Sequence, residues 1–234
     1  MRTYVATFVA LMKACGELKD VDRGHDLHVD VVNNGLLEES NSFLGNTLVH
    51  MYSKCGSFAK AQKVFETLPV RDVVSWTALI TGIDAMYSED AMNFFEYMQL
   101  EGVSPNVATF VCVLKVCSST KAIEKGREIH IDIEKKGFLE GEVVIGNALV
   151  DMYAKCGSFT NAVNLFEKLP IRDKVSWTSL IMGYTRQRYG EKALQHFEQM
   201  QVEGICLDSV AYLCSLKACS YSTRVESIRS KLHS

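Results

Sequence analysis

The sequence contains only three prolines among 234 residues, and no apolar run approaches the ~18 residues that a membrane-spanning helix requires. Scarce proline favours helical structure, and short apolar runs argue against a bilayer span. No Cys-x-x-Cys pair occurs, so the His-x-Glu and downstream Cys-x-x-Cys pattern of a zinc deaminase is missing as well. We therefore expect neither a membrane protein nor a zinc centre of this kind.

An excess of basic charge is also missing. The chain has 25 Lys and Arg side chains against 28 Asp and Glu side chains, which gives a net charge of −3 and a pI near 6.1. Nucleic-acid-binding domains often have a pI above about 9. Affinity for a polyanion comes largely from counterion release, so any nucleic-acid function must work here without a large positive charge.

The composition is that of an ordinary folded chain, with 47% hydrophobic, 23% charged and 9% aromatic residues. It includes eight cysteines. Cys112 and Cys117, like Cys214 and Cys219, are five residues apart, which places them about 140° from one another on a helix and prevents joint metal ligation. We interpret the cysteines as free packing thiols in a reducing compartment.

Internal repetition is the dominant feature of the chain. Residues 5–15, VATFVALMKAC, match residues 107–117, VATFVCVLKVC, at seven of eleven positions, and residues 209–219 are a third copy. GNTLVHMYSKCGS from Gly45 matches GNALVDMYAKCGS from Gly146 at ten of thirteen positions. These offsets of 102 and 101 residues are too long for one supersecondary unit, so shorter helical units must lie within each period.

Each period divides into three units that each accommodate one pair of helices. The predicted units are 5–41, 42–72, 73–106, 107–142, 143–173 and 174–208, followed by a partial unit over 209–234. A single unit cannot bury its own apolar face, so neighbours must stack. The sequence therefore predicts an all-α fold, a right-handed α-solenoid (superhelix) of about six to seven helix-turn-helix repeats in one continuous solenoid.

Helix signals within the units support this division. Lys54-Cys55-Gly56-Ser57 predicts a helix end followed by a glycine and a serine able to cap the next helix, and residues 155–158 repeat the pattern. An alanine four residues before a phenylalanine predicts a buried stripe on the second helix of four units, at Ala61 and Phe65, Ala91 and Phe95, Ala162 and Phe166, and Ala193 and Phe197. Pro69 and Pro170 are expected to stop the second helices.

The amino terminus superficially resembles a signal peptide, because Met1 and Arg2 precede a mostly apolar stretch. The same helix recurs from Val107, and its first copy contains Lys13, so we interpret it as part of a repeat. A chain that opens in one repeat and stops partway through another, after Ser209, is expected to be a fragment or an abbreviated gene model.

These units resemble the pentatricopeptide repeat family, specifically the plant PLS branch, which alternates standard, long and short repeats. VVSWTALITG and KVSWTSLIMGY resemble the standard repeat, TFVCVLKVCSSTKAIEKGREIHIDIEKKG the long type, and GNALVDMYAKCGSFTNAVNLFEKLPIRD the short type. The likeness covers nearly the whole chain. It implies binding of single-stranded RNA, one nucleotide per repeat, with the RNA running 5′ to 3′ as the protein runs from its amino to its carboxyl end.

The resemblance also implies a two-residue code for base choice, made by the fifth and last residues of each repeat. The pairs are Asn46 with Asp72 and Asn147 with Asp173, which favour U, Thr77 with Asn106, which favours A, and Thr178 with Asp208, which favours G. The long repeats carry Val9 with Asn41 and Val111 with Glu142, which fall outside the better-understood code. The implied footprint is any-U-A-any-U-G.

Further roles follow from the same resemblance. The second residues of four repeats, Phe43, Val74, Val144 and Val175, would flank the bases. Lys54, Lys155 and Arg186 would contact phosphates, since each lies eight residues after a fifth residue and therefore on the same helical face. Short amide, hydroxyl and carboxylate groups at the code positions supply the donors and acceptors that an exposed base edge requires.

Structural alternatives exist for each of these residues. Asp72, Asp173, Asp208 and Asn106 each precede a first helix, where N-capping alone explains them, and the cations favour helix ends in any case. Local hydrogen bonds would satisfy Asn46 and Asn147. The recurring aromatics Trp76, Trp177, Tyr52 and Tyr153 are expected in the core, and His28 and His130 are expected to be packing residues.

The sequence leaves three candidate functions for this chain. Sequence-specific RNA binding as a specificity factor in organellar RNA processing or C-to-U editing ranks first, and a protein-protein scaffold resembling tetratricopeptide solenoids is the alternative. An enzyme is the third, but no side chain is assigned a catalytic or metal-binding role, and no cofactor is expected. The resemblance implies a mitochondrial or chloroplast location, small editing-factor proteins on the long repeats, and a deaminase supplied in trans.

Overall fold

The computed structural model describes residues 2–37, 42–83 and 88–221, and in these residues it contains thirteen α-helices and no strand. The chain divides into two compact units, residues 1–113 and 114–234. No helix in the described part is long and apolar enough to cross a membrane.

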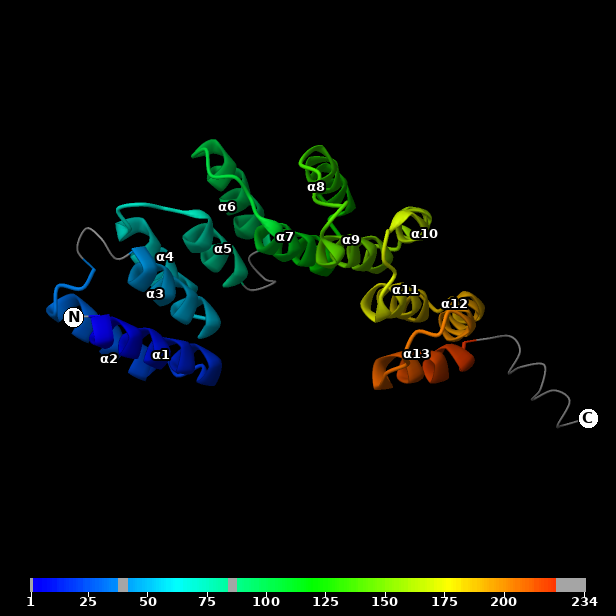
Figure 1. Ribbon diagram of the computed structural model, residues 1–234, viewed down its shortest axis with the longest axis horizontal. Helices are drawn as coiled ribbons and strands as arrows, with labels where there is room; N and C mark the ends of the chain where they lie inside the picture. Colours follow the sequence, from blue (N-terminus) through cyan, green and yellow to red (C-terminus); the bar gives the residue numbers. More distant parts are fainter. Residues whose placement is uncertain (1, 38–41, 84–87, 222–234) are drawn as a thin grey trace, which may run out of the picture. The chain divides into compact units, whose positions relative to one another are not determined.

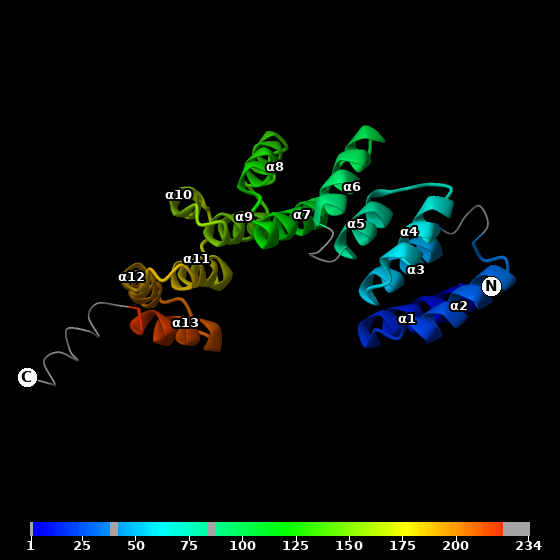
Figure 2. The same ribbon diagram turned by 180° about the vertical axis from the view of Figure 1, so that it is seen from behind.

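The first unit consists of paired helices whose first members pack side by side (Figures 1 and 2). Helix α3 lies between α1 and α5 and also contacts α4, while α2 packs on α1 and α6 packs on α5. The helices are α1 (Arg2–Leu18), α2 (Val21–Asn33), α3 (Ser42–Lys54), α4 (Phe58–Thr67), α5 (Val73–Thr81) and α6 (Ser88–Leu100), followed by the start of α7 (Val107–Thr120).

The second unit repeats this arrangement. Helix α11 lies between α9 and α13, and the helices α8, α10 and α12 pack against these first helices. The bounds are α8 (Ile123–Lys135), α9 (Val143–Lys155), α10 (Phe159–Lys168), α11 (Lys174–Arg186), α12 (Gly190–Val202) and α13 (Ser209–Cys219). The predicted all-α repeat solenoid is therefore confirmed. Its handedness and the division into seven repeats stay predictions. The pairing of Val9 with Asn41 also stays a prediction, because Asn41 lies outside the described residues.

Two kinds of helix start occur in the described chain, one with an extended backbone at the N-cap residue and one without. Asp72, Asp173 and Asp208 have an extended backbone, with ψ between 175° and 178°, and their side chains accept from N–H groups of the first helical turn. Ser57 and Ser158 have ψ of 65° and 67°, and neither side chain caps its helix. The predicted serine caps are therefore wrong.

The glycines between these helices behave as predicted. Gly56 and Gly157 have φ of +72° and +79°, a left-handed conformation that a glycine adopts without steric cost. Helices α4 and α10 end at Thr67 and Lys168, just before the two prolines.

The stripe of small and aromatic residues on the second helices packs into a core that also contains apolar side chains of the first helices. Phe65 and Phe166 are buried, and each lies edge-to-face against a buried tryptophan of the next first helix, with ring centroids 4.6 Å from those of Trp76 and Trp177. Phe95 is buried too, whereas Phe197 is only partly buried. The two tryptophans are thus core residues, as expected, and cannot serve as stacking platforms for bases.

Two histidine–tyrosine pairs join second helices to the first helices that follow them. His28 Nδ1 lies 3.1 Å from the Tyr52 hydroxyl, and His130 Nδ1 lies 2.9 Å from that of Tyr153. Both tyrosines are buried, which confirms their predicted packing role. All eight cysteines are free, and burial raises the pKa of Cys117 to about 11, so this thiol is unreactive at neutral pH.

Candidate nucleic-acid interface

The fifth and last residues of the short units meet across successive first helices. The Asn46 amide of α3 donates to both carboxylate oxygens of Asp72, at 3.1 and 3.0 Å, and the Asn147 amide of α9 donates to both oxygens of Asp173, at 3.1 and 3.2 Å. Each partner lies 26 residues further along the chain. The structure thus joins these predicted site residues into two equivalent amide–carboxylate clasps.

The same aspartates cap the helices that follow them. Asp72 Oδ1 accepts from the backbone N–H groups of Val74 and Ser75, both at 2.9 Å, and Asp173 Oδ1 accepts from that of Ser176 at 2.9 Å. Capping is therefore real, and it uses Oδ1. The asparagine amide donates to Oδ2 as well as to Oδ1, so capping and a role at the interface do not exclude each other.

Each clasp contains one polar atom without a hydrogen-bond partner. The Oδ1 atoms of Asn46 and Asn147 are buried and accept no hydrogen bond from a described residue. A buried acceptor without a partner costs about 1–3 kcal/mol, so its occurrence at both equivalent positions calls for a reason.

The standard unit of residues 73–106 forms a longer polar chain. The hydroxyl oxygens of Thr77 and Thr109 are 2.7 Å apart, and Thr109 donates to Asn106 Oδ1 from its backbone N–H at 2.9 Å and from its hydroxyl at 3.0 Å. Asn106 and Thr109 form a reciprocal capping box, because the Asn106 N–H in turn lies 3.3 Å from the Thr109 hydroxyl. Sequence analysis missed Thr109, although the recurring VATF motif contains it.

The other standard unit is arranged differently. The Thr178 hydroxyl donates to the carbonyls of Lys174 and Val175 in its own helix, and no hydrogen bond joins it to Asp208 in the described structure. Asp208 accepts from the Ala211 N–H at 2.9 Å and lies 3.6 Å from the Lys174 ammonium. The Ala211 N–H and the Lys174 ammonium lower the pKa of Asp208, so its carboxylate is ionised at neutral pH.

A groove of about 420 Å³ in the first unit gathers several of these residues. Its lining comes from four successive first helices, and includes the predicted residues Phe43, Asn46, Val74, Thr77 and Asn106. Lys13 and His50 line it as well. His50 is one turn beyond Asn46, and burial together with the nearby Lys54 lowers its pKa, so it is neutral at pH 7.

The predicted base-flanking residues are exposed despite their apolar side chains. Phe43, Val74, Val144 and Val175 are 59%, 54%, 56% and 49% exposed. Each lies in the first turn of a first helix, next to the buried code positions. The pattern combines apolar groups at the surface with polar groups beneath them, which suits a flat ring with polar edges.

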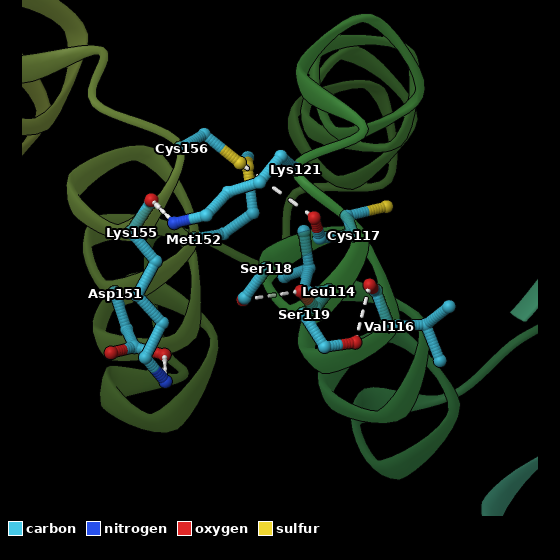
Figure 3. A network of polar contacts seen from close by, with 10 residues as sticks. All are labelled: Leu114, Val116, Cys117, Ser118, Ser119, Lys121, Asp151, Met152, Lys155 and Cys156. Atoms are coloured by element: carbon cyan, nitrogen blue, oxygen red, sulfur yellow. Dashed lines mark hydrogen bonds and ion pairs between the residues drawn. The ribbon is translucent and has the colours of Figure 1, made fainter. Parts of the chain in front are cut away.

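Two of the three predicted phosphate ligands already have carboxylate partners. Lys54 Nζ lies 3.1 Å from Glu17 Oε1, and Lys155 Nζ lies 2.6 Å from Asp151 Oδ2. Figure 3 shows that the Lys155 carbonyl also accepts from the Lys121 ammonium. Arg186 is exposed and forms no ion pair with a described residue. Sequence reasoning missed the pair of Lys54 with Glu17 because Glu17 comes from a different repeat and helix, whereas Asp151 and Lys155 lie four residues apart on α9.

Models of one repeat family match four stretches of this chain. The PPR repeat matches residues 46–73 and 147–172, the pentatricopeptide repeat domain matches 70–120, and the PPR repeat family matches 172–220. Together these matches cover more than half of the 234 residues.

Similar proteins from Arabidopsis thaliana carry the same repeats. The chain is 38% identical over 214 residues to the pentatricopeptide repeat-containing protein At4g18520, chloroplastic. The aligned region covers 91% of this chain and 34% of that protein. It is 38% identical over 221 residues to the pentatricopeptide repeat-containing protein At2g33680, and the aligned region covers 94% of this chain and 30% of that protein. The chain thus spans about a third of the length of these relatives.

The fold is shared with solved structures. The pentatricopeptide repeat protein PPR10, in complex with an 18-nt psaJ RNA element, matches with a TM-score of 0.70 at 15% identity, covering 95% of this chain and 33% of that one. At this identity the likeness shows the fold alone. The repeat models, the relatives and the shared solenoid fold show that the chain belongs to the pentatricopeptide repeat family.

Proposed function

We propose that this chain binds single-stranded RNA sequence-specifically, with one nucleotide per repeat and the footprint any-U-A-any-U-G. The observation that carries the proposal is the repeated clasp, Asn46 with Asp72 and Asn147 with Asp173, flanked by exposed apolar side chains. A solenoid that bound only a protein would not require the same pair, a buried asparagine and a partly buried aspartate, at equivalent positions of two repeats. PPR10, whose fold matches, is itself described in complex with RNA.

The chemistry of the clasp suits uracil. The Watson–Crick edge of uracil presents one N–H donor between two carbonyl acceptors, and each asparagine has an unpartnered Oδ1 acceptor. A small movement of the amide toward the groove would pair that acceptor with the base. The aspartate would continue to hold the asparagine and to cap the next helix during this movement.

The resemblance to plant relatives supports the proposal that this RNA binding occurs in an organelle. One relative is described as chloroplastic, and the family implies a role in RNA processing or C-to-U editing in the chloroplast or mitochondrion. In this proposal the chain selects the RNA, and none of its own residues has a catalytic role. Small editing-factor proteins and a deaminase supplied in trans would complete the editing role.

The experiment measures fluorescence anisotropy of the purified chain at low salt with an RNA containing AUAAUGA and with an RNA in which the coded bases are scrambled. We expect binding to the coded RNA to be at least about tenfold tighter, the equivalent of roughly 1.4 kcal/mol. In Asn106→Asp, the preferred base at the third position should change from A to G. Aspartate caps the equivalent helices at positions 72, 173 and 208, so this variant keeps the cap.

A matched control makes the same kind of change away from the interface. Asp20 caps the second helix α2 by accepting from the Arg23 N–H, so Asp20→Asn should leave base preference unchanged. Equal affinity for coded and scrambled RNA, or a preference that Asn106→Asp does not alter, would contradict modular recognition. Binding to neither RNA would favour the protein-scaffold alternative.

A further inference from the structure

A second groove in the first unit lies between the second helices α2 and α4. It has a volume of about 430 Å³, and its lining includes His25, Val32, Lys60, Lys63 and Val64. His28 and Tyr52 also reach it. None of its lining residues belongs to the first-helix groove with the predicted code residues.

The charged groups of this groove are all basic. Lys60 and Lys63 lie one turn apart on α4, and neither forms an ion pair with a carboxylate of the described chain. Lys60 Nζ instead lies 5.7 Å from the centre of the Tyr52 ring. Burial, and then the nearby His25 and Lys60, lower the pKa of His28.

The equivalent surface of the second unit provides an internal comparison. Its histidine–tyrosine pair, His130 with Tyr153, has the same geometry as His28 with Tyr52, so this pair is common packing. The surrounding charges differ. At offsets of 101 and 102 residues, Lys60, Lys63 and Val32 correspond to Asn161, Asn164 and Glu134. Glu134 Oε1 lies 3.6 Å from His130 Nε2.

The comparison separates what the fold requires from what is particular to the first unit. The fold is preserved with asparagines at the two lysine positions and with a glutamate in place of the valine. The two lysines are therefore not needed for packing, and they leave two cations without acidic partners beside an apolar wall. Val32 is 52% exposed in this wall, and Val64 is buried behind it.

We propose that the α2–α4 groove binds an acidic, aliphatic peptide segment of a partner protein, with its carboxylates between Lys60 and Lys63 and its aliphatic side chains against Val32 and Val64. The apolar wall favours a peptide over a nucleic acid, because no phenylalanine, tyrosine or tryptophan ring among the described lining residues is exposed for base stacking, and the exposed ring of His25 is the small imidazole. Tyr52 is 1% exposed, and its hydroxyl lies 3.3 and 3.1 Å from the nitrogens of His25 and His28. The editing-factor contact implied by the family resemblance would occur on both long repeats, whereas this site exists on the first only.

The experiment uses the full chain and two fluorescein-labelled hexapeptides, one of alternating leucine and glutamate and one of alternating leucine and glutamine. We expect the glutamate peptide to bind at least tenfold more tightly at low salt. The double variant Lys60→Asn, Lys63→Asn should lose this preference. Because asparagine occupies both positions in the second unit, the variant should fold normally, which circular dichroism checks.

A control variant of equal charge change is Lys135→Asn, Lys136→Asn, which removes two exposed lysines at the end of α8. It should keep the preference for the glutamate peptide. An equal loss in both double variants would mean that only net charge matters, and this would overturn the proposal.

Two further outcomes would also overturn it. Labelled hexauridine is the third probe, and if Lys60→Asn, Lys63→Asn weakens its binding while the peptide preference is unchanged, the groove is a nucleic-acid surface. Glu38 and Glu39 follow Leu37 in the sequence and remain in every variant. If the chain's own carboxylates fill the groove, the glutamate peptide will show no preference, and the proposed partner site does not exist.

Discussion

At the scale of single residues, the aspartates before the first helices serve two structural purposes at once. Asp72 holds the start of α5 through its Oδ1 atom and the buried Asn46 amide through both oxygens. An N-cap contributes about 1 kcal/mol, and a buried amide that loses its acceptor costs about 1–3 kcal/mol. The clasp therefore links the stability of one repeat to the side chain that the family code assigns to base recognition.

This link predicts a coupling between the two residues. Asp72→Ala should destabilise the chain more than Asn46→Ala, because it removes a cap and also leaves a buried amide without an acceptor. The double variant should cost about 0.5–3 kcal/mol less than the sum of the single variants. Urea unfolding of the four proteins, followed by circular dichroism, measures the coupling.

The control for this cycle pairs Asn46→Ala with Asp20→Ala. Asp20 caps α2 by accepting from the Arg23 N–H, and its carboxylate lies near the exposed Arg23 side chain. Unlike Asp72, it accepts from no buried side-chain amide in the described structure. Its effect should add to that of Asn46→Ala within about 0.5 kcal/mol. Simple additivity in the Asn46 and Asp72 cycle as well would mean that the clasp contributes nothing.

At the scale of helices, the first helices pack on one another at close range. Where α11 crosses α9, a Cβ atom built on Gly183 would lie 2.5 Å from the Cβ atom of Ala154. Gly82 at the end of α5 has the same relation to Ser53 of α3, with a distance of 2.3 Å to its Cβ atom. Neither neighbour can move without its backbone, so the stacking distance depends on the absence of a side chain.

This packing predicts an effect opposite to helix propensity. Alanine is favoured over glycine in a helix by about 1 kcal/mol, yet Gly183→Ala should destabilise the second unit by about 1–3 kcal/mol through overpacking. Gly141→Ala is the control, because nothing lies within 4 Å of its built Cβ atom. Thermal unfolding of both variants tests this, and a Gly183→Ala chain as stable as the parent would show that the helices separate freely.

At the scale of the whole molecule, the net charge of −3 limits how much RNA affinity counterion release can supply. Ion pairs reduce it further, since Glu17 and Asp151 already neutralise Lys54 and Lys155. Acidic residues on the second helices, including Glu89, Asp90 and Glu198, are exposed. In the proposed RNA binding, recognition would therefore depend more on base contacts than on total charge.

The prediction at this scale concerns salt. Arg186→Gln should weaken binding to coded and scrambled RNA by the same factor, and it should reduce the slope of log K against log salt by about 0.7, the value for one phosphate contact on a single strand. Arg127→Gln, on the second helix α8 and paired with Glu124, should leave the slope unchanged. A change in base preference in Arg186→Gln, or an equal change of slope in both variants, would contradict a phosphate role for Arg186.

The sequence alone determined the helical repeat and most of its core. Periodicity, glycines in left-handed turns and the alanine–phenylalanine stripe are local properties, so they predicted the helix pairs and the buried Trp76 and Trp177 correctly. Tertiary structure decided which polar groups meet. Ser57 and Asp72 are both good capping residues by type, but only the Asp72 side chain accepts from N–H groups of its helix. Similarly, Lys54 and Glu17 are 37 residues apart, and only the stacking of α1 on α3 brings their opposite charges within 3.1 Å.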